Sequence, residues 1–317
     1  MLHLRPLKSA AQSLSPYRAV APWIAGFEDP LRLLSYAPGG ADEAGAWAGS
    51  VVAELVAARR QASFQRWQQG LEDWRLWVRE VRHLQSELAL DPHGRRLLAW
   101  LTFADFSHQP FVRTAEFIGV EFPGGVSFAG AEFSADAWFS GARFNGRTDF
   151  CGTRFGGDAF FEQSWFKAET RFDRAAFVGS ARFSAVIALS GFFACKTQFE
   201  SDLWMRSSQM FGPLTFAKSQ MSGEAGFGNC NFQDVDFSHT DFYDNAGFED
   251  SVFAGSANFE HACFGRNARF ERTQFAIQPH FKAARFFHAC HFDDAMIPLI
   301  QSPAVTCREE IERRLQS

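Results

Sequence analysis

Large apolar residues recur from residue 104 to about residue 298 at intervals that alternate between five and six. The series starts at Phe106, Phe111 and Phe117, so one full repeat combines a shorter and a longer interval. It defines 36 centres ending at Ile297, and 30 of these centres are Phe. The other centres are Ala188, Ala194, Met205, Met210, Met221 and Ile297. The alternation breaks once, at three centres that are each five apart: Phe232, Phe237 and Phe242. Such regularity predicts a repeat architecture.

A small residue precedes each centre by two positions in 31 of the 36 units, as Ala104 precedes Phe106 and Ala257 precedes Phe259. Residues two apart in an extended chain point to the same side, so both members of each pair are expected to face inward. A unit of five or six residues is too short for a helical hairpin, and can only form one side of a coil that stacks on the previous coil. The pattern therefore predicts a solenoid with a core of stacked Phe rings.

Individual units resemble the pentapeptide-repeat family, with its small, polar, Leu or Phe, Ser, Thr or Arg, and variable positions. The units that carry the resemblance are ADFSH at residues 104–108, VDFSH at 235–239 and TDFYD at 240–244. The resemblance implies an all-β solenoid, a right-handed quadrilateral β-helix. The extra residue in every second unit makes a coil of 22 residues rather than 20 and is expected to bulge two of the four corners. The 36 sides then make about nine coils, roughly 43 Å long at about 4.8 Å per coil.

The chain before the repeats predicts an α-helical N-terminal cap region. Residues 1–40 are rich in Pro and Gly and predict an irregular arm, whereas residues 41–102 have helical periodicity. Asp42 can cap a first helix, and a single long helix is expected from Phe64 to Leu88. The repeats then occupy residues 103–298, and residues 299–317 form a tail with a short helix at 308–315. We expect the helices to form a hairpin that covers the first coil, because an exposed sheet edge invites aggregation.

The tryptophans of this helical region allow a second interpretation. Trp47, Trp67, Trp74 and Trp77 could form a surface for a partner or an oligomer instead of packing on the first coil. A membrane-surface helix is disfavoured, because residues 59–88 carry six Arg and four acidic residues. No apolar run is long enough to span a membrane, so we expect no membrane span.

The register of the repeats predicts an aromatic cluster on the outside of coils two to five. Its members lie immediately before repeat centres on two adjoining sides: Trp138, Phe160, Trp165, Ile187 and Trp204. Exposed aromatic residues in a group mark an interface or are covered within the chain. Either the N-terminal helices fold back over them, or they bind another protein or a second copy of the chain.

Charge provides a second candidate surface. The chain has a net charge of −5, and residues 104–297 contain 23 acidic and 16 basic residues. The acidic candidates gather near the irregular interval, and are Asp234, Asp236, Asp241, Asp244, Glu249 and Asp250. Some pentapeptide-repeat proteins mimic duplex DNA and protect type II topoisomerases from inhibitors, so the resemblance implies a topoisomerase such as gyrase as an alternative partner. Arginines in coils two to four interrupt the acidic surface, and direct nucleic-acid binding is disfavoured by the overall negative field.

Motifs for chemistry are weak throughout the sequence. His288, Cys290 and His291 are close together and are followed by Asp293 and Asp294. The register, however, turns Cys290 inward and places the two histidines on different sides of a corner. His239 and His261 occupy equivalent outward positions one coil apart, where their rings should stack. We therefore expect no catalytic residue, no cofactor and no metal site, and we expect reduced cysteines in a cytoplasmic protein. The predicted function is a non-enzymatic scaffold or adaptor that binds protein through the outer faces of the solenoid.

Overall fold

The computed structural model describes residues 48–88, residue 98 and residues 102–298. These residues divide into two compact units, which are described separately. The first unit contains two helices and the strands β1, β4 and β5, and the second contains the other strands. The predicted arm at 1–40, the cap by Asp42 with Trp47, and the tail helix at 308–315 lie outside the described residues.

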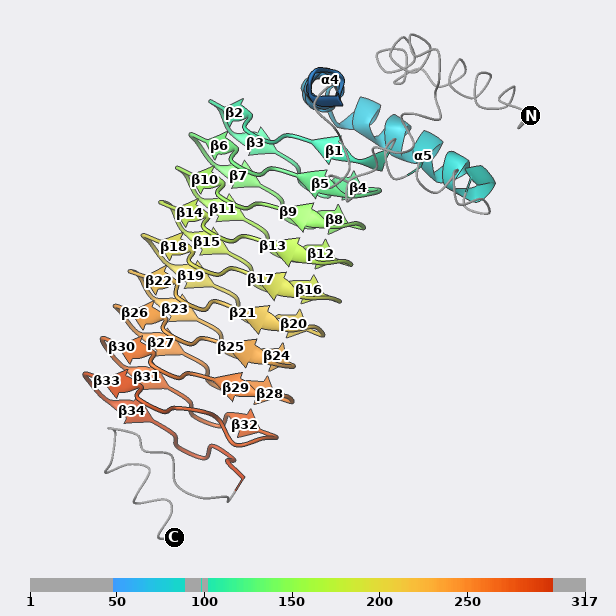
Figure 1. Ribbon diagram of the computed structural model, residues 1–317. Helices are drawn as coiled ribbons and strands as arrows, with labels where there is room; N and C mark the ends of the chain where they lie inside the picture. The colour runs from blue at the N-terminus through green and yellow to red at the C-terminus, as the bar shows by residue number, and fades with distance from the viewer. Residues whose placement is uncertain (1–47, 89–97, 99–101, 299–317) are drawn as a thin grey trace. The chain divides into compact units, whose positions relative to one another are not determined.

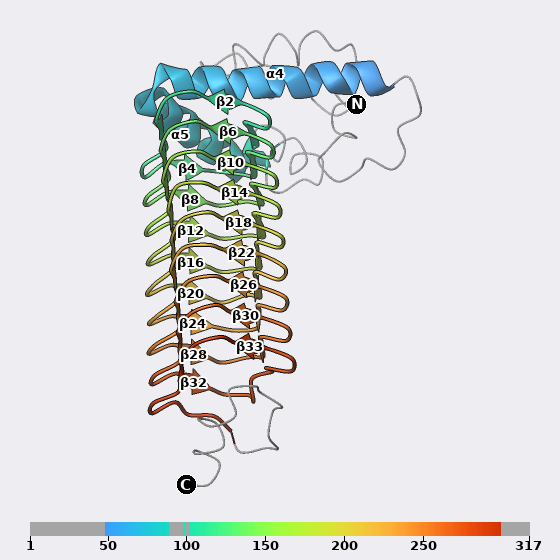
Figure 2. The ribbon, with the colours of Figure 1, turned by 90° about the vertical axis from the view of Figure 1, so that its left-hand side faces the viewer.

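The repeat region is a parallel β-solenoid of about nine coils with four sheets, which confirms the predicted fold class. Figures 1 and 2 show strands of successive coils stacked in register along each side. Every strand is two residues long, because a repeat of five or six residues leaves only that length between corners. Sheet A contains β1 (Ala104–Asp105), β5 (Val126–Ser127), β9 (Thr148–Asp149), β13 (Thr170–Arg171), β17 (Phe192–Phe193), β21 (Leu214–Thr215), β25 (Val235–Asp236) and β29 (Ala257–Asn258).

The other three sheets follow the same pattern. Sheet B contains β2 (Pro110–Phe111), β6 (Glu132–Phe133), β10 (Arg154–Phe155), β14 (Ala176–Phe177), β18 (Gln198–Phe199), β22 (Gln220–Met221), β26 (Asp241–Phe242), β30 (Cys263–Phe264) and β33 (Arg285–Phe286). Sheet C contains β3 (Ala115–Glu116), β7 (Ala137–Trp138), β11 (Ala159–Phe160), β15 (Ala181–Arg182), β19 (Leu203–Trp204), β23 (Ala225–Gly226), β27 (Ala246–Gly247), β31 (Ala268–Arg269) and β34 (Cys290–His291). Sheet D contains β4 (Glu121–Phe122), β8 (Arg143–Phe144), β12 (Trp165–Phe166), β16 (Ile187–Ala188), β20 (Gln209–Met210), β24 (Asn231–Phe232), β28 (Val252–Phe253) and β32 (Gln274–Phe275).

Strand register confirms the predicted coil length and its single irregularity. Ala159 pairs with Ala181, and Val235 pairs with Ala257 at the same separation in sequence. Leu214 pairs with Val235, a separation that is shorter by one residue. The short interval between Phe232 and Phe237 therefore removes one residue from one coil and leaves the stacking intact.

Two kinds of corner alternate around the coil. Apart from the shortened interval after Phe232, each five-residue interval turns through one residue with left-handed backbone, whereas the six-residue intervals bend without one. The left-handed residues are His108, Gly119, Gly130, Gly141, Gly152, Gln163, Arg174, Ala185, Lys196, Ser207, Lys218, Asn229, His239, Asp250, His261, Arg272, Ala283 and Asp294. The extra residue predicts a distortion at the corners of the six-residue intervals. The left-handed backbone, which is sterically unfavourable for residues with a Cβ, lies instead at the corners of the five-residue intervals.

The core is a set of Phe columns. All 36 repeat centres except Phe286 and Ile297 are buried. Phe161 stacks on Phe139 at 4.8 Å and on Phe183 at 4.7 Å between ring centroids, with the planes nearly parallel. Parallel rings recur because identical side chains occupy identical positions in each coil, at the spacing of the parallel strands.

In one coil the inward Phe lies two residues before the repeat centre instead of at the centre. Where the repeat centre is Ala194, the residue two before it is Phe192, which is buried and stacks on Phe172 at 5.3 Å. The large and small members of the inward pair have exchanged places. Core volume is thus conserved in the coil that appears weakest in the sequence.

Inward Ser and Thr residues provide hydrogen bonds between coils. Thr153 Oγ1 donates to the carbonyl of Phe128 at 2.8 Å, and Ser208 Oγ donates to that of Phe183 at 2.9 Å. Cys230 Sγ occupies the equivalent position and lies 2.8 Å from the carbonyl of Met205. The small polar residues of the repeat therefore fill space and satisfy buried carbonyls.

The first unit contains two helices where the sequence predicts one from Phe64 to Leu88. Helix α4 spans Ala48–Gln69 and α5 spans Leu71–Leu88, and Gly70 separates them at a φ of 104°. This prediction is wrong because Gly70 adopts a backbone conformation that ends a helix and that other residues avoid. Neither described helix has the length and apolarity needed to cross a membrane.

Helix α5 packs on first-coil residues of the same unit. Trp74 stacks on Phe106, and its Nε1 donates to the carbonyl of Glu121 at 2.8 Å. From α4, Ser63 Oγ accepts the backbone N–H of Asp105 at 2.9 Å. These hydrogen bonds satisfy the backbone carbonyl of Glu121 and the backbone N–H of Asp105 in the first coil.

Candidate protein-interaction face

Outward residues of sheet C form the ladder that the sequence predicts. Trp138, Phe160, Arg182 and Trp204 are partners in register in successive coils. The Trp138 and Phe160 rings stack at 4.1 Å, and the Arg182 guanidinium lies 5.3 Å from the centroid of the Phe160 ring. Phe160 is therefore covered on both sides, and these side chains are half-buried rather than fully exposed.

The ladder continues through Trp204. The Arg206 guanidinium lies over the Trp204 ring at 4.6 Å and also faces Glu224 at 3.9 Å. A Cβ added at Gly226 in the next coil would lie 2.6 Å from the Trp204 ring, so Gly226 makes room for the indole. The arginines are held between aromatic rings and carboxylates, which fixes their positions on the outer surface.

Sheet D carries the exposed part of the surface. Trp165 is 44% exposed and pairs in register with Ile187, which is half-buried. Leu189 and Phe211, one coil apart, are 45% and 55% exposed. Three large apolar side chains therefore face solvent in coils three, four and five. We define Trp165, Leu189 and Phe211 as the sheet D stripe.

Leu189 and Phe211 are absent from the predicted aromatic cluster. That cluster contains residues directly before repeat centres, whereas Leu189 and Phe211 directly follow the centres Ala188 and Met210. The residues after each centre stack in the same register, and their identities in the sequence would have added Leu189 and Phe211 to Trp165.

The predicted acidic candidates do not form one surface. Asp236 lies in sheet A and Asp241 in sheet B, whereas Glu249 and Asp250 follow the sheet C strand β27, and Asp234 and Asp244 occupy corners. Three of the six pair with arginines one coil later: Asp244 with Arg266 at 3.6 Å, Glu249 with Arg269 at 2.9 Å and Asp250 with Arg272 at 2.6 Å. The hydrogen bond from Arg272 lowers the pKa of Asp250. Internal pairing reduces the negative field that a DNA mimic requires.

Two of the helical tryptophans that were predicted as partner contacts, Trp74 and Trp77, are buried. Trp74 and Trp77 are 2% and 0% exposed and contact each other at 4.9 Å. They belong to the core of the first unit, because the apolar stripe of α5 packs inward. Trp67 is half-buried beside Phe64.

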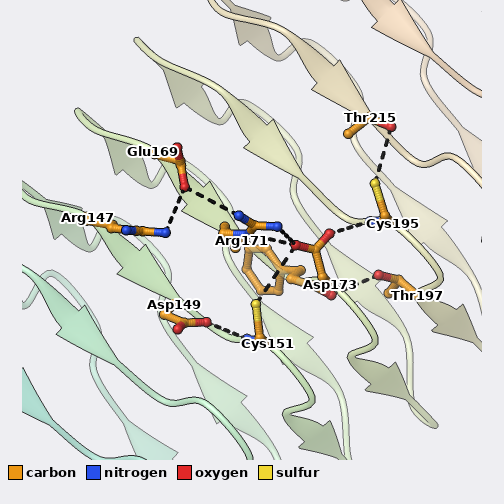
Figure 3. A network of polar contacts seen from close by, with 10 residues as sticks. Arg147, Asp149, Cys151, Glu169, Arg171, Asp173, Cys195, Thr197 and Thr215 are labelled. Atoms are coloured by element: carbon orange, nitrogen blue, oxygen red, sulfur yellow. Dashed lines mark hydrogen bonds and ion pairs between the residues drawn. The ribbon is translucent and has the colours of Figure 1, made fainter. Parts of the chain in front are cut away.

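A polar network on sheet A links adjacent coils without producing a reactive group (Figure 3). Asp173 accepts hydrogen bonds from Arg171 Nε at 2.7 Å and from the backbone N–H of Cys195 at 2.9 Å. Cys151 Sγ lies 4.0 Å from Asp173 Oδ2. Burial, followed by the nearby Asp149 and Asp173 carboxylates, raises the pKa of Cys151 to about 12. This thiol is therefore protonated at neutral pH and is a poor nucleophile.

The histidine ladder forms as the register predicts. His239 and His261 stack at 4.7 Å with nearly parallel rings. Both residues have left-handed backbone, at φ values of 55° and 59°, so the pair lies at a corner between sheets A and B. The five cysteines in the described residues are free thiols, and Cys290 points inward as expected.

Comparison with known proteins places part of the repeats in a family. Residues 227–274 match the family model described as pentapeptide repeats (9 copies). No curated protein and no solved structure matches the chain. The matched segment includes the shortened interval after Phe232 and confirms the resemblance seen in the units at 235–239 and 240–244, whereas the unit at 104–108 lies outside the match. Residues 227–274 therefore consist of pentapeptide repeats, and the Phe-centred solenoid continues with the same four sheets on either side of this segment.

Proposed function

We propose that this chain is a non-enzymatic scaffold that binds a protein partner through the sheet D stripe, with the sheet C ladder beside it. The observation that carries the proposal is the exposure of Trp165, Leu189 and Phe211 in three successive coils. Fully burying a large apolar side chain contributes about 1.5–3 kcal/mol, and covering side chains that are about half exposed contributes roughly half of that for each of the three anchors.

The sheet C ladder supplies a suitable polar border. Arg182 lies over Phe160 and 3.7 Å from Asp158, and Arg206 lies over Trp204. Arginines already held in place lose little conformational entropy when they contact a partner. An apolar centre with ordered arginines beside it is the usual composition of a protein interface.

A topoisomerase-binding DNA mimic receives less support. Its candidate carboxylates are spread over different sides, and Asp244, Glu249 and Asp250 are paired with arginines. The two functions differ in their response to salt, because binding through exposed charges weakens as ionic strength rises and apolar binding does not.

The test uses two triple variants in a capture experiment from native cell extract. One replaces the sheet D stripe with Trp165→Ser, Leu189→Ser and Phe211→Ser. The matched control replaces three exposed residues that directly follow sheet B centres, Val112→Ser, Tyr243→Ser and Phe287→Ser, whose exposures are 75%, 54% and 65%. Partners identified by mass spectrometry at about 0.1 and 0.5 M salt should persist at high salt with the control and disappear with the sheet D variant.

Circular dichroism and thermal melting establish that both variants remain folded. Equal capture by the two variants would reject the sheet D stripe as the binding surface. Capture of a type II topoisomerase that is lost at about 0.5 M salt, with both variants alike, would favour the DNA-mimic alternative instead.

A further inference from the structure

Three potential metal ligands meet on the outer side of sheet C in the last two coils. Glu271 follows β31, His291 belongs to β34, and Asp293 follows the centre Phe292. Arg269 and His291 are partners in register, so Glu271 and Asp293, each two residues further on, occupy equivalent positions one coil apart. One imidazole nitrogen and one oxygen from each carboxylate lie within 4.8 Å of one another.

The two arginines nearest to Glu271 in the sequence bind other carboxylates. Arg269 turns toward earlier coils and binds Glu249 at 2.9 Å and Glu224 at 3.1 Å. Arg272, the next residue along the chain, binds Asp250 at 2.6 Å. Glu271 Oε2 is a buried oxygen with no hydrogen-bond partner among the described residues. A buried carboxylate oxygen beside a second carboxylate is costly unless a cation joins them.

We propose that Glu271, His291 and Asp293 bind a divalent first-row transition-metal ion of the Zn²⁺ type. An imidazole favours zinc, iron or nickel over magnesium and calcium, and two carboxylates neutralise the charge of the ion. Tetrahedral bonds of about 2.0–2.1 Å place ligand atoms about 3.3 Å apart. The three ligand atoms already lie within 4.8 Å of one another, so binding would require a small movement of the side chains, of which Asp293 is the exposed one. Three protein ligands leave a fourth position for water.

This site was not visible in the local sequence. The nearby group of His288, Cys290 and His291 suggests a metal motif, but Cys290 is buried in the core. The proposed set takes His291 from that group and adds Asp293, two residues further on, and Glu271 from the preceding coil. A bound ion would join the eighth and ninth coils and so hold the C-terminal end of the solenoid together.

Isothermal titration calorimetry of the full chain with Zn²⁺, after removal of metals with chelator, tests the proposal. The wild-type chain should bind one ion at this site, and His291→Ala should weaken that binding by more than about tenfold, since even changes behind the ligands cost about 10 to 100-fold. Asp293→Asn should act in the same direction and keeps the shape of the side chain. The matched control is His288→Ala, which removes an exposed histidine three residues away and should leave the affinity unchanged.

Thermal melting with and without Zn²⁺ provides a second measurement. The melting temperature should rise with Zn²⁺ for the wild type and for His288→Ala, but not for His291→Ala or Asp293→Asn. Absence of Zn²⁺ binding by the wild-type chain would overturn the proposal. Equal binding by the wild type, His291→Ala and Asp293→Asn would also overturn it, because the ion would then bind elsewhere.

Discussion

Small inward residues such as Cys230 both fill the core and contact a backbone carbonyl of the preceding coil. Its sulfur lies at the position that Ser208 and Ser251 occupy in the neighbouring coils, and all three contact a carbonyl of the preceding coil. Burial raises the pKa of Cys230 to about 12. The thiol therefore resembles its serine neighbours in geometry and differs from them in its response to alkali.

Replacing Cys230 by Ser should make the stability of the protein less sensitive to high pH. The thiol has a pKa of about 8.5 in the unfolded chain and about 12 when folded, so between these values the unfolded chain binds fewer protons. The free energy of unfolding therefore falls as pH rises above about 8.5 and is unaffected below it. Urea unfolding at pH 7 and pH 10 should show Cys230→Ser gaining about 1–2 kcal/mol on the wild type at the higher pH. A difference that is the same at both pH values would contradict this assignment.

The inward residues of the repeat could be predicted from the sequence. The centres and their small partners were assigned from spacing alone, because large inward side chains exclude other arrangements. The ion pairs of Asp244, Glu249 and Asp250 were not predicted, because each joins residues in different coils that are far apart in the sequence. Such pairs can be recognised only after the coil length is known and side-chain directions are added.

The corners of the five-residue intervals have left-handed backbone, which is strained for residues that carry a Cβ. Gly141 and Ala185 occupy equivalent left-handed positions two coils apart, at φ values of 67° and 58°. A Cβ added at Gly141 would make only an ordinary contact, at 3.9 Å from Gly119. The pair therefore isolates backbone conformation from packing.

Opposite substitutions at this corner should have opposite effects. Gly141→Ala should lower the free energy of unfolding by about 1 kcal/mol, because left-handed backbone costs about 1–2 kcal/mol for a residue with a Cβ and the stiffer unfolded chain offsets part of that cost. Ala185→Gly should raise it or leave it unchanged for the reverse reason. Chemical unfolding of the two variants measures both effects. Stabilisation by Gly141→Ala would show that the corner relaxes out of the left-handed region.

Gly70 shows why the helices were harder to predict than the strands. The apolar stripe from Phe64 to Leu88 continues across the break, and periodicity alone favoured one helix. A single glycine inside a helical pattern is tolerated in many helices, so its φ of 104° becomes evident only in the structure. The aromatic cluster was also predicted only in part. Its register was correct, but the positions of Arg182 and Arg206 over the aromatic rings and the exposure of Leu189 were not predicted.

At the scale of the whole molecule, the solenoid behaves as a series of coils that contact only their neighbours. Phe161 lies in the middle of a column and stacks on Phe139 and Phe183. Phe286 lies in the last coil, is half-buried, and stacks within its column on Phe264. A Phe ring in the middle of the solenoid is therefore expected to contribute more to the free energy of unfolding than a Phe ring in the last coil.

Replacing these two rings by Ala should therefore have unequal and local effects. Phe161→Ala should cost about 3–5 kcal/mol, because it opens a cavity between two coils that cannot collapse, whereas Phe286→Ala should cost about 1–2 kcal/mol. Hydrogen exchange should show faster opening of coils two to four in Phe161→Ala while coils seven to nine retain their protection. If exchange instead accelerates equally in all coils, the repeats unfold as one cooperative unit, and a nearest-neighbour description of this solenoid is wrong.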